Sequence, residues 1–197
     1  MKFSIYPAAC LRVGVTQLAV AAIFTFTTIN TAEAIQPPVK DTYITLSLPG
    51  VVGDFAGVPN APSNSIQVLA LSFGASCPGL PGSACTNPSL SDVSITKLVD
   101  DASPALFLAT VKSTTYATAV LYFWQAPTSG TAYTKTYTVY LTQAAIDSLQ
   151  QGGGEGGSPS ESVSLRFTSI SLFDNVSGAV ACYNVSTKAS STSSQTC

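Results

Sequence analysis

Hydrophobic and polar positions alternate along most of this chain with a period of two. Ile44, Leu46 and Leu48 share one parity of the first such stretch, and the same spacing recurs over Tyr116–Trp124. Successive side chains of a β-strand point to opposite faces, so a period of two predicts strands. One stretch alone, Pro104–Lys112, is predicted to be a helix. The pattern therefore predicts an all-β domain with one short α-helix.

A predicted strand over Ser89–Val99 runs directly into this helix. Asp100 and Asp101 end the strand, and Ser103 follows where a hydroxyl can cap a helix N-terminus. Pro104 suits the first helical position, because its missing N–H would have no partner there. The sequence therefore predicts a strand, a serine cap and a helix in direct succession. The positions of the strand that share one parity are Val93, Ile95 and Val99.

Two predicted strands are apolar on both faces. Over Asn64–Gly74 and over Tyr116–Trp124, hydrophobic residues occupy both parities. Strands of this kind are covered on both sides. One cover is the interior of the domain, and the predicted helix supplies part of the other. The sequence leaves open whether the remaining cover is internal or a neighbouring copy of the chain.

The last predicted strand, Glu161–Phe173, changes parity near Thr168–Ser169. A change of parity within a strand predicts a bulge or a bend, which is how small barrels turn corners. The strand before it is predicted to close at Asp147 and Ser148. A glycine-rich linker, Gly152–Ser158, then joins the two strands.

Several segments of the chain also carry a family resemblance, in their order and spacing as well as in their residues. They are Tyr43–Gly50 (YITLSLPG), Asn64–Gly74 (NSIQVLALSFG), Pro88–Val111 (PSLSDVSITKLVDDASPALFLATV), Thr136–Leu149 and Glu161–Phe173 (ESVSLRFTSISLF). Together they span Thr42 to Asp174 and resemble the haemolysin-coregulated proteins (Hcp), the tube proteins of type VI secretion.

The resemblance to Hcp implies a small β-barrel of two packed antiparallel sheets with one short α-helix. It brings no catalytic residues and no cofactor. It implies instead a structural subunit that assembles with copies of itself into rings. We expect these rings to be hexameric and to stack into a tube. The implied partners are therefore the chain itself and effector proteins carried in the lumen.

The N-terminus is predicted to be a secretion signal. Lys2 and Arg12 form a short basic region, Val13–Phe26 is largely apolar, and small residues lead up to Ala34. We expect cleavage after Ala34. The alternative is a retained membrane anchor, although the apolar run is short for a span of roughly 20 residues.

This prediction divides the chain into three parts. Residues 1–34 are the signal peptide, residues 35–185 the Hcp-like barrel domain, and residues 186–197 a flexible Ser/Thr-rich tail. The mature protein is expected to be secreted or periplasmic, in a Gram-negative bacterium. Type VI tube proteins carry no cleavable signal, so export of this kind departs from the resemblance.

Charge is sparse in the predicted mature chain. Without Lys2, Arg12 and Glu33, six basic and nine acidic side chains remain. Nucleic-acid binding needs a clustered basic face, and so does adhesion to an anionic membrane. The composition therefore predicts neither a nucleic-acid partner nor a membrane partner after removal of the signal.

Four cysteines remain after the predicted cleavage, Cys77, Cys85, Cys182 and Cys197. An even number in an exported chain favours disulfides. Three pairings are possible, and the simplest pairs Cys77 with Cys85 and Cys182 with Cys197. The alternative for the first pair is a metal site, which the absence of histidine disfavours. The alternative for Cys197 is a cross-link between subunits.

The residues of most catalytic sites are missing. With no histidine, the chain has neither a Ser-His-Asp nor a Cys-His arrangement. Asp100 and Asp101 are neighbours that point to opposite faces, so we expect solvated carboxylates near the helix N-terminus. Glu155 and Glu161 flank the glycine-rich linker and are not expected to be held in place. The sequence therefore predicts no enzyme, no cofactor and no metal.

Two predicted loops carry the candidate subunit contacts. The first holds Val51, Val52 and Phe55, which are unfavourable to expose to water. The second holds Leu80 between Cys77 and Cys85, at the position of the loop through which Hcp proteins touch neighbouring subunits.

Two alternatives from other classes remain open at this point. One is a toxin or hydrolase, which the missing histidine leaves with little support. The other is a monomeric secreted binding module, whose aromatic candidates are Tyr43, Tyr122, Trp124, Tyr137 and Tyr140.

Overall fold

The computed structural model describes residues 41–129, 132–193 and 197. Its elements in chain order are β1 (Thr42–Ser47), β2 (Ile66–Val68), β3 (Ala70–Ser72), β4 (Ala75–Ser76), β5 (Ser89–Leu90), β6 (Val93–Leu98), α1 (Ser103–Val111), β7 (Thr115–Gln125), β8 (Thr134–Gly152), β9 (Ser160–Arg166), β10 (Ser169–Asp174), β11 (Val180–Asn184) and β12 (Ser190–Ser191).

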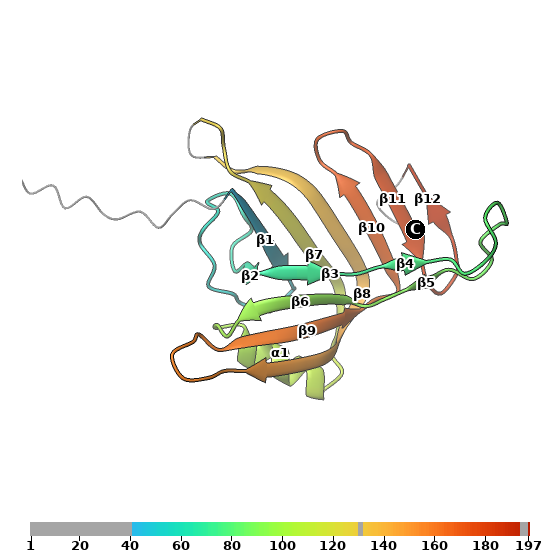
Figure 1. Ribbon diagram of the computed structural model, residues 1–197. Helices are drawn as coiled ribbons and strands as arrows, with labels where there is room; N and C mark the ends of the chain where they lie inside the picture. Colours follow the sequence, from blue (N-terminus) through green and yellow to red (C-terminus); the bar gives the residue numbers. More distant parts are fainter. Residues whose placement is uncertain (1–40, 130–131, 194–196) are drawn as a thin grey trace, which may run out of the picture. The chain divides into compact units, whose positions relative to one another are not determined.

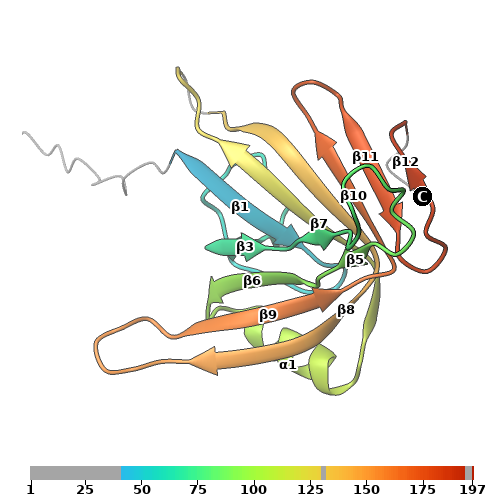
Figure 2. The same ribbon diagram turned by 45° about the vertical axis from the view of Figure 1, so that its right-hand side comes forward.

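All strand pairs are antiparallel, and the 19-residue strand β8 joins the two layers of the fold. The first half of β8 lies between β7 and β10, in a sheet of order β12-β11-β10-β8-β7-β1-β2. Its second half pairs with β9, which pairs with β6, which pairs with β3. Figures 1 and 2 show β8 as a long curved strand that bends from one layer into the other. A separate two-stranded sheet consists of β4 and β5.

The predicted all-β class with one helix is confirmed, but the barrel is not closed. β2 pairs with β1, and β3 pairs with β6, so the chain changes partner at Leu69 between them. The Leu69 N–H donates to the Thr96 carbonyl oxygen 2.7 Å away, which turns the chain toward β6. One predicted strand over Asn64–Gly74 is therefore two short strands that belong to different layers.

The core lies between these layers and beneath α1. Side chains of both layers fill it, and Leu106 and Ala109 close it from the helix. Its fully enclosed hydrophobic members include Leu46, Ile66, Val93, Ile95, Leu121, Val139, Leu141, Val163 and Leu165.

The structure corrects two predicted strand ends and confirms a third. The predicted strand over Ser89–Val99 is interrupted after Leu90, and Val99 at its end is exposed. The expectation that Asp147 and Ser148 close the preceding strand is wrong, because β8 continues to Gly152 with β9 beside it. The change of parity near Thr168–Ser169 is confirmed, since β9 ends before it and β10 begins after it with a different partner.

The helix occupies the predicted segment, but its N-terminus is built differently. Ser103 is the first helical residue, and the N-cap residue Ala102 makes no side-chain cap hydrogen bond. The predicted serine cap is therefore wrong: the Ser103 hydroxyl donates to the Glu161 carboxylate at 2.7 Å instead. At the other end, Ser113 adopts φ 50°, a left-handed conformation that ends the helix.

A buried ion pair joins β6 to β9 beside the start of α1. Lys97 shares the inward parity of β6 with Val93 and Ile95, and it lies directly opposite Glu161 on β9. The Lys97 Nζ is 2.6 Å from Glu161 Oε1, and both side chains have 0% exposure to solvent. Removing two charges from water is unfavourable unless each is fully paired.

The surrounding groups supply that pairing. Asp100 Oδ1 lies 2.6 Å from the same ammonium, and the Leu98 carbonyl accepts from it at 2.7 Å. Gln151 donates from its Nε2 to the second oxygen of Glu161 at 2.7 Å. Asp100 Oδ1 also accepts from the N–H of Ala102, just before the helix. One network thus ties β6, β8, β9 and the start of α1 together.

This network contradicts two expectations from the sequence. Asp100 is not a solvated residue, since only 11% of its side chain is exposed and it pairs with Lys97. Glu161 does not sit loosely beside a flexible linker, because it is held between β6 and β8. Burial by itself raises the pKa of Glu161, but hydrogen bonds from Lys97, Gln151 and Ser103 outweigh it and hold the pKa below its usual value.

The C-terminal part of the fold consists of two consecutive hairpins with the same turn. Asp174 Oδ1 accepts from the amides of Val176 and Ser177 in the β10–β11 turn, and Asn184 Oδ1 does the same in the β11–β12 turn. The segment expected to be a flexible tail therefore includes β12, which pairs with β11. Among the described residues, the one helix is too short to cross a membrane.

Breaking the buried pair from one side should destabilise the protein strongly. We expect Lys97→Met to lower the free energy of unfolding by about 3–5 kcal/mol, because Glu161 remains buried without its main partner. The measurement is urea denaturation. The matched control is Arg166→Ala, whose pair with Asp147 is about half exposed at 3.1 Å and should contribute less than about 1 kcal/mol. Equal losses for the two variants would contradict this account.

The same pair should make the protein sensitive to acid. Because the folded state lowers the pKa of Glu161, the unfolded state binds its proton more readily. The stabilisation is therefore complete above the ordinary glutamate pKa of about 4.3 and is lost as the pH falls below it. We expect Glu161→Gln to show a shallower fall in unfolding free energy than the wild type between about pH 5 and pH 3. Parallel pH profiles would exclude this carboxylate as a cause.

Candidate assembly surface

The segment Gly74–Ser91 forms an arm that extends from the layers of the fold. Its stem is the β4–β5 ribbon, in which only Ala75↔Leu90 and Ser76↔Ser89 are paired. At its base, the Ser91 N–H donates to the Gly74 carbonyl at 2.9 Å. Figures 1 and 2 show the ribbon passing beside β10–β12, with the loop beyond it. Every residue from Gly74 to Asn87 is exposed.

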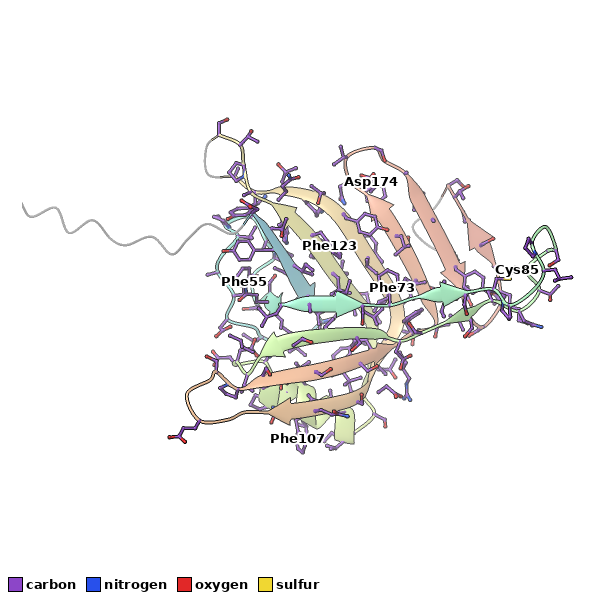
Figure 3. All side chains as sticks on the ribbon, viewed as in Figure 1. Phe55, Phe73, Cys85, Phe107, Phe123 and Asp174 are labelled. Atoms are coloured by element: carbon purple, nitrogen blue, oxygen red, sulfur yellow. A yellow bond between two sulfur atoms is a disulfide. The ribbon has the colours of Figure 1, made fainter. Side chains whose placement is uncertain are left out.

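A disulfide closes the tip of the arm. Cys77 and Cys85 are bonded, with a Cα–Cα distance of 5.8 Å, and Figure 3 shows Cys85 at the outer end. A crosslink around so short a loop stabilises by about 2–3 kcal/mol in the chain-entropy model. Within the loop, the Ser83 N–H donates to the Leu80 carbonyl at 3.1 Å. The Leu80 side chain is thereby presented to solvent with 81% of its surface exposed.

An apolar groove lies between the stem of the arm and the β10–β11 hairpin. Its volume is about 270 Å³, and it carries no charged side chain. A polar contact bridges the arm and the second hairpin, from Lys188 Nζ to Asn87 Oδ1 at 2.9 Å. The groove is lined by Phe73, Gly74, Ala75, Pro88, Leu90, Ile170, Leu172, Ala181, Cys182 and Tyr183.

A second disulfide joins Cys182 of β11 to Cys197. Cys182 is buried and lies in a strand that is paired with β10 on one side and with β12 on the other. The Cys197 carbonyl accepts from Asn184 Nδ2 at 3.3 Å. This disulfide therefore reinforces a strand that is already hydrogen-bonded on both sides. Cys77–Cys85, in contrast, lies in a loop that no strand of the large sheet pairs with.

The loop between β1 and β2 is largely folded against the sheet. Val58 and Trp124 form the centre of a small second core, and the Phe55 ring packs 5.2 Å from that of Tyr43. A Cβ at Gly53 would lie 2.3 Å from the Ser65 carbonyl oxygen, so only glycine permits this close return of the chain. The loop thus serves first as a cover for the end of the sheet.

The outer face of α1 is entirely apolar. Phe107, Leu108 and Val111 expose between 47% and 61% of their surfaces, and Figure 3 shows Phe107 on the outer side of the helix. The helix sequence, SPALFLATV, has no charged residue on any side. A helix that is hydrophobic all round is normally buried. The sequence analysis missed this surface, although the uncharged helix was the signal for it.

The four residues predicted to contact other subunits fall into two groups. Val51 lies in the core and Phe55 is half-buried, so neither presents much surface to a partner. Val52, 56% exposed, and Leu80 remain available. Ala34, the predicted cleavage residue, lies outside the described residues.

The structure also places one of the aromatic residues that were candidates for ligand binding. Trp124 is buried and donates from its Nε1 to Thr45 Oγ1 at 2.9 Å, so it does not serve as an exposed binding platform. In the part of the chain that the structure describes, no group of three or more Cys, Asp or Glu side chains is arranged to hold a metal ion. The exposed apolar residues of the arm tip and of α1 suit contacts between proteins.

Comparison with a protein-family model identifies the sequence. The model described as "Type VI secretion system effector, Hcp" matches residues 46–172, more than half of the chain. The matched region runs from β1 into β10 and includes the arm and α1. No curated protein matches the chain.

Solved structures share the fold at low sequence identity. Hcp1 from Salmonella typhimurium is 18% identical with a TM-score of 0.63, over 77% of this chain and 100% of that chain. Hcp1 from E. coli EAEC 042 is 16% identical with a TM-score of 0.62, over 74% and 99%. A type VI secretion system effector from Yersinia pestis is 21% identical with a TM-score of 0.58, over 72% and 99%. These likenesses establish the fold.

The disulfide pairing can be read directly from a digest of the oxidised protein. Trypsin cleaves after Lys97, Arg166 and Lys188, so local pairing leaves Cys77 and Cys85 in one peptide, joined to no other. We expect residues 167–188 to be linked to residues 189–197 through Cys182 and Cys197 in a non-reducing mass spectrum. A link between residues 41–97 and either of those peptides would contradict the structure.

Proposed function

This chain belongs to the Hcp family of type VI secretion system proteins, and we propose that it is an exported member that assembles with itself into hexameric rings. Members of this family are structural tube proteins, and the chain is accordingly a structural protein and not an enzyme. In our proposal the rings stack into a tube, and effector proteins travel in its lumen.

The observation that carries this proposal is the exposed apolar surface at separate places on one sparsely charged domain. Leu80 stands at the tip of the arm, Phe107 and Val111 lie on the outer face of α1, and Val52 lies on the β1–β2 loop. Isolated exposed hydrophobic residues are ordinary, but a whole helix face and the tip of a rigid arm favour a protein partner.

The position of the arm supports contacts between different surfaces of neighbouring subunits. An arm that reaches from one subunit to another forms a heterologous contact, which must close into a ring or continue as a filament. Ring-on-ring contacts are free to repeat. The arm and the helix face thus provide the two kinds of contact that a stacked tube needs.

The proposal includes the route and the boundaries of the mature protein. Residues 1–34 act as a signal peptide that is cleaved after Ala34, and residues 35–185 form the barrel domain. Residues 186–197 form the Ser/Thr-rich tail, within which β12 pairs with β11 and Cys197 is bonded to Cys182. Two intramolecular disulfides suit a periplasmic or extracellular location, because such compartments are oxidising. We infer a Gram-negative host from the family.

One observation favours a second candidate function. The apolar groove beneath the arm has a volume of about 270 Å³, near the lower end of small-ligand sites, and could serve a monomeric binding module built on the same fold. The two functions differ in that the ring subunit must self-associate, whereas the binding module acts as a monomer.

Self-association should depend on the arm tip. We expect the oxidised mature protein to have about six times the subunit mass by light scattering, and Leu80→Asp to remain a monomer, because a buried charge at the contact is unfavourable. Since Leu80 is exposed in the subunit, its thermal midpoint should change by no more than about 2 °C.

The matched control is Val176→Asp, at a site that is 75% exposed on the β10–β11 turn, away from the arm tip. This variant should assemble as the wild type does. A wild type that stays monomeric at high concentration would refute the ring and leave the binding module. Assembly of Leu80→Asp with wild-type affinity would remove the arm tip from the interface.

A further inference from the structure

We propose that the Cys77–Cys85 disulfide is an assembly switch: the arm holds its contact shape only when these two thiols are oxidised. The inference rests on the proposed function, because it assigns a regulation to the same arm. It differs from that function in naming the chemical step that makes assembly possible.

The arm has few interactions of its own. Its stem consists of two residue pairs between β4 and β5, and every residue from Gly74 to Asn87 is exposed. A two-stranded ribbon of this length is marginal in water without further support. The polar contact from Lys188 to Asn87 is at the surface, so it adds little. Hydrogen bonds between Gly74 and Ser91 and the packing of Leu90 against the core hold the base of the arm. Beyond the stem, the disulfide is the main restraint.

The second disulfide differs in each of these respects. Cys182 is buried in β11, which is paired along five residues with β10. Reduction of Cys182–Cys197 would leave that strand in its sheet. Cys77–Cys85 thus determines the conformation of the arm, whereas Cys182–Cys197 only reinforces β11. Removal of Cys182–Cys197 is therefore the matched control for removal of Cys77–Cys85.

Oxidation of the arm is an exchange with a disulfide donor of the oxidising compartment. The Cys77 or Cys85 thiolate attacks one sulfur of the donor's disulfide, forms a mixed disulfide and releases one donor thiolate. The second arm thiolate then attacks the arm sulfur of the mixed disulfide and releases the other donor sulfur. Two electrons and two protons pass from the arm dithiol to the donor, and one S–S bond replaces another.

The consequence is an order of events. Before export, in a reducing compartment, the arm dithiol leaves Leu80 on a mobile loop that does not present one surface to a partner. After export, the crosslink fixes the loop and contacts form without a large ordering penalty. The protein is thereby kept from assembling on the wrong side of the membrane.

The test compares Cys77→Ser/Cys85→Ser with Cys182→Ser/Cys197→Ser and the oxidised wild type. Two readouts are taken on each protein, amide hydrogen exchange of residues 74–91 and mass by light scattering. We expect arm exchange to quicken on the order of tenfold or more in the first variant and to stay unchanged in the second. We expect the first variant to be a monomer and the second to assemble.

Exchange in β7 serves as the folding check, since this strand is paired with β1 and β8, contributes Ala119 and Leu121 to the core, and should be protected in all three proteins. If the first variant does not fold, the wild type is reduced under native conditions and its exposed arm thiols are alkylated. The buried Cys182 should escape the reagent, but the exposed Cys197 would react if its disulfide were reduced, so the Cys182→Ser/Cys197→Ser variant is treated in parallel. The same two readouts then apply.

The outcomes separate this inference from the function beneath it. Wild-type assembly with equal assembly of the Cys77→Ser/Cys85→Ser variant overturns the switch and leaves the ring in place. A monomeric wild type refutes the ring, and the amide exchange of residues 74–91 then tests the redox inference alone. Faster exchange without the crosslink supports redox control of the conformation of the arm. Equal exchange in the two proteins overturns that control.

Discussion

The buried pair between Lys97 and Glu161 is the constraint on which the arrangement of this fold depends. An ammonium and a carboxylate with no access to water are tolerated only when their partners are fixed, and here those partners come from β6, β8, β9 and the start of α1. A shift of the helix along the sheet would take the Ser103 hydroxyl away from both Lys97 and Glu161. The pair fixes β6 against β9, and the hydrogen bonds of Ser103 and Ala102 attach the start of the helix to it, although a well-packed apolar cluster could stabilise the same arrangement equally.

That fixed helix position determines what the protein shows to its surroundings. With Leu106 and Ala109 directed into the core, Phe107 and Val111 are directed outward, and the helix cannot turn to hide them. On the arm, the Cys77–Cys85 crosslink has the same effect on the loop that carries Leu80. Both surfaces are apolar because the subunit is one part of a larger assembly, in our account, and both are held rigidly by interactions that do not take part in the contact.

Much of the fold could be predicted from the sequence because its dominant signal is local. A period of two identified the strands, and the change of parity near Thr168–Ser169 located the step from β9 to β10. The change of strand partner at Leu69 could not be predicted, because it depends on which neighbouring strand β2 and β3 each find. The predicted contact residues show the same limit. The exposure of Leu80 could be predicted from its place in a loop, whereas the burial of Val51 depends on tertiary packing.

The buried charges show that the sequence pattern can contain a signal that is easily misinterpreted. Lys97 has the parity of Val93 and Ile95, and Glu161 has the parity of Val163, so both were placed on inward faces by the pattern itself. A charged residue on an inward face points to a buried partner, since it is not stable there alone. Pairing the two across β6 and β9 needed the register, which only the structure provides.

The central claim, that rigid apolar surfaces on this subunit exist to contact other copies, is tested most directly by a reconstruction of the oxidised mature protein from electron micrographs. The account predicts rings with six-fold symmetry in which the arm of each subunit, with Leu80 at its tip, rests on another subunit and the outer face of α1 is covered. Single particles of one subunit, or rings in which the arm and the helix face both remain in solvent, would contradict it.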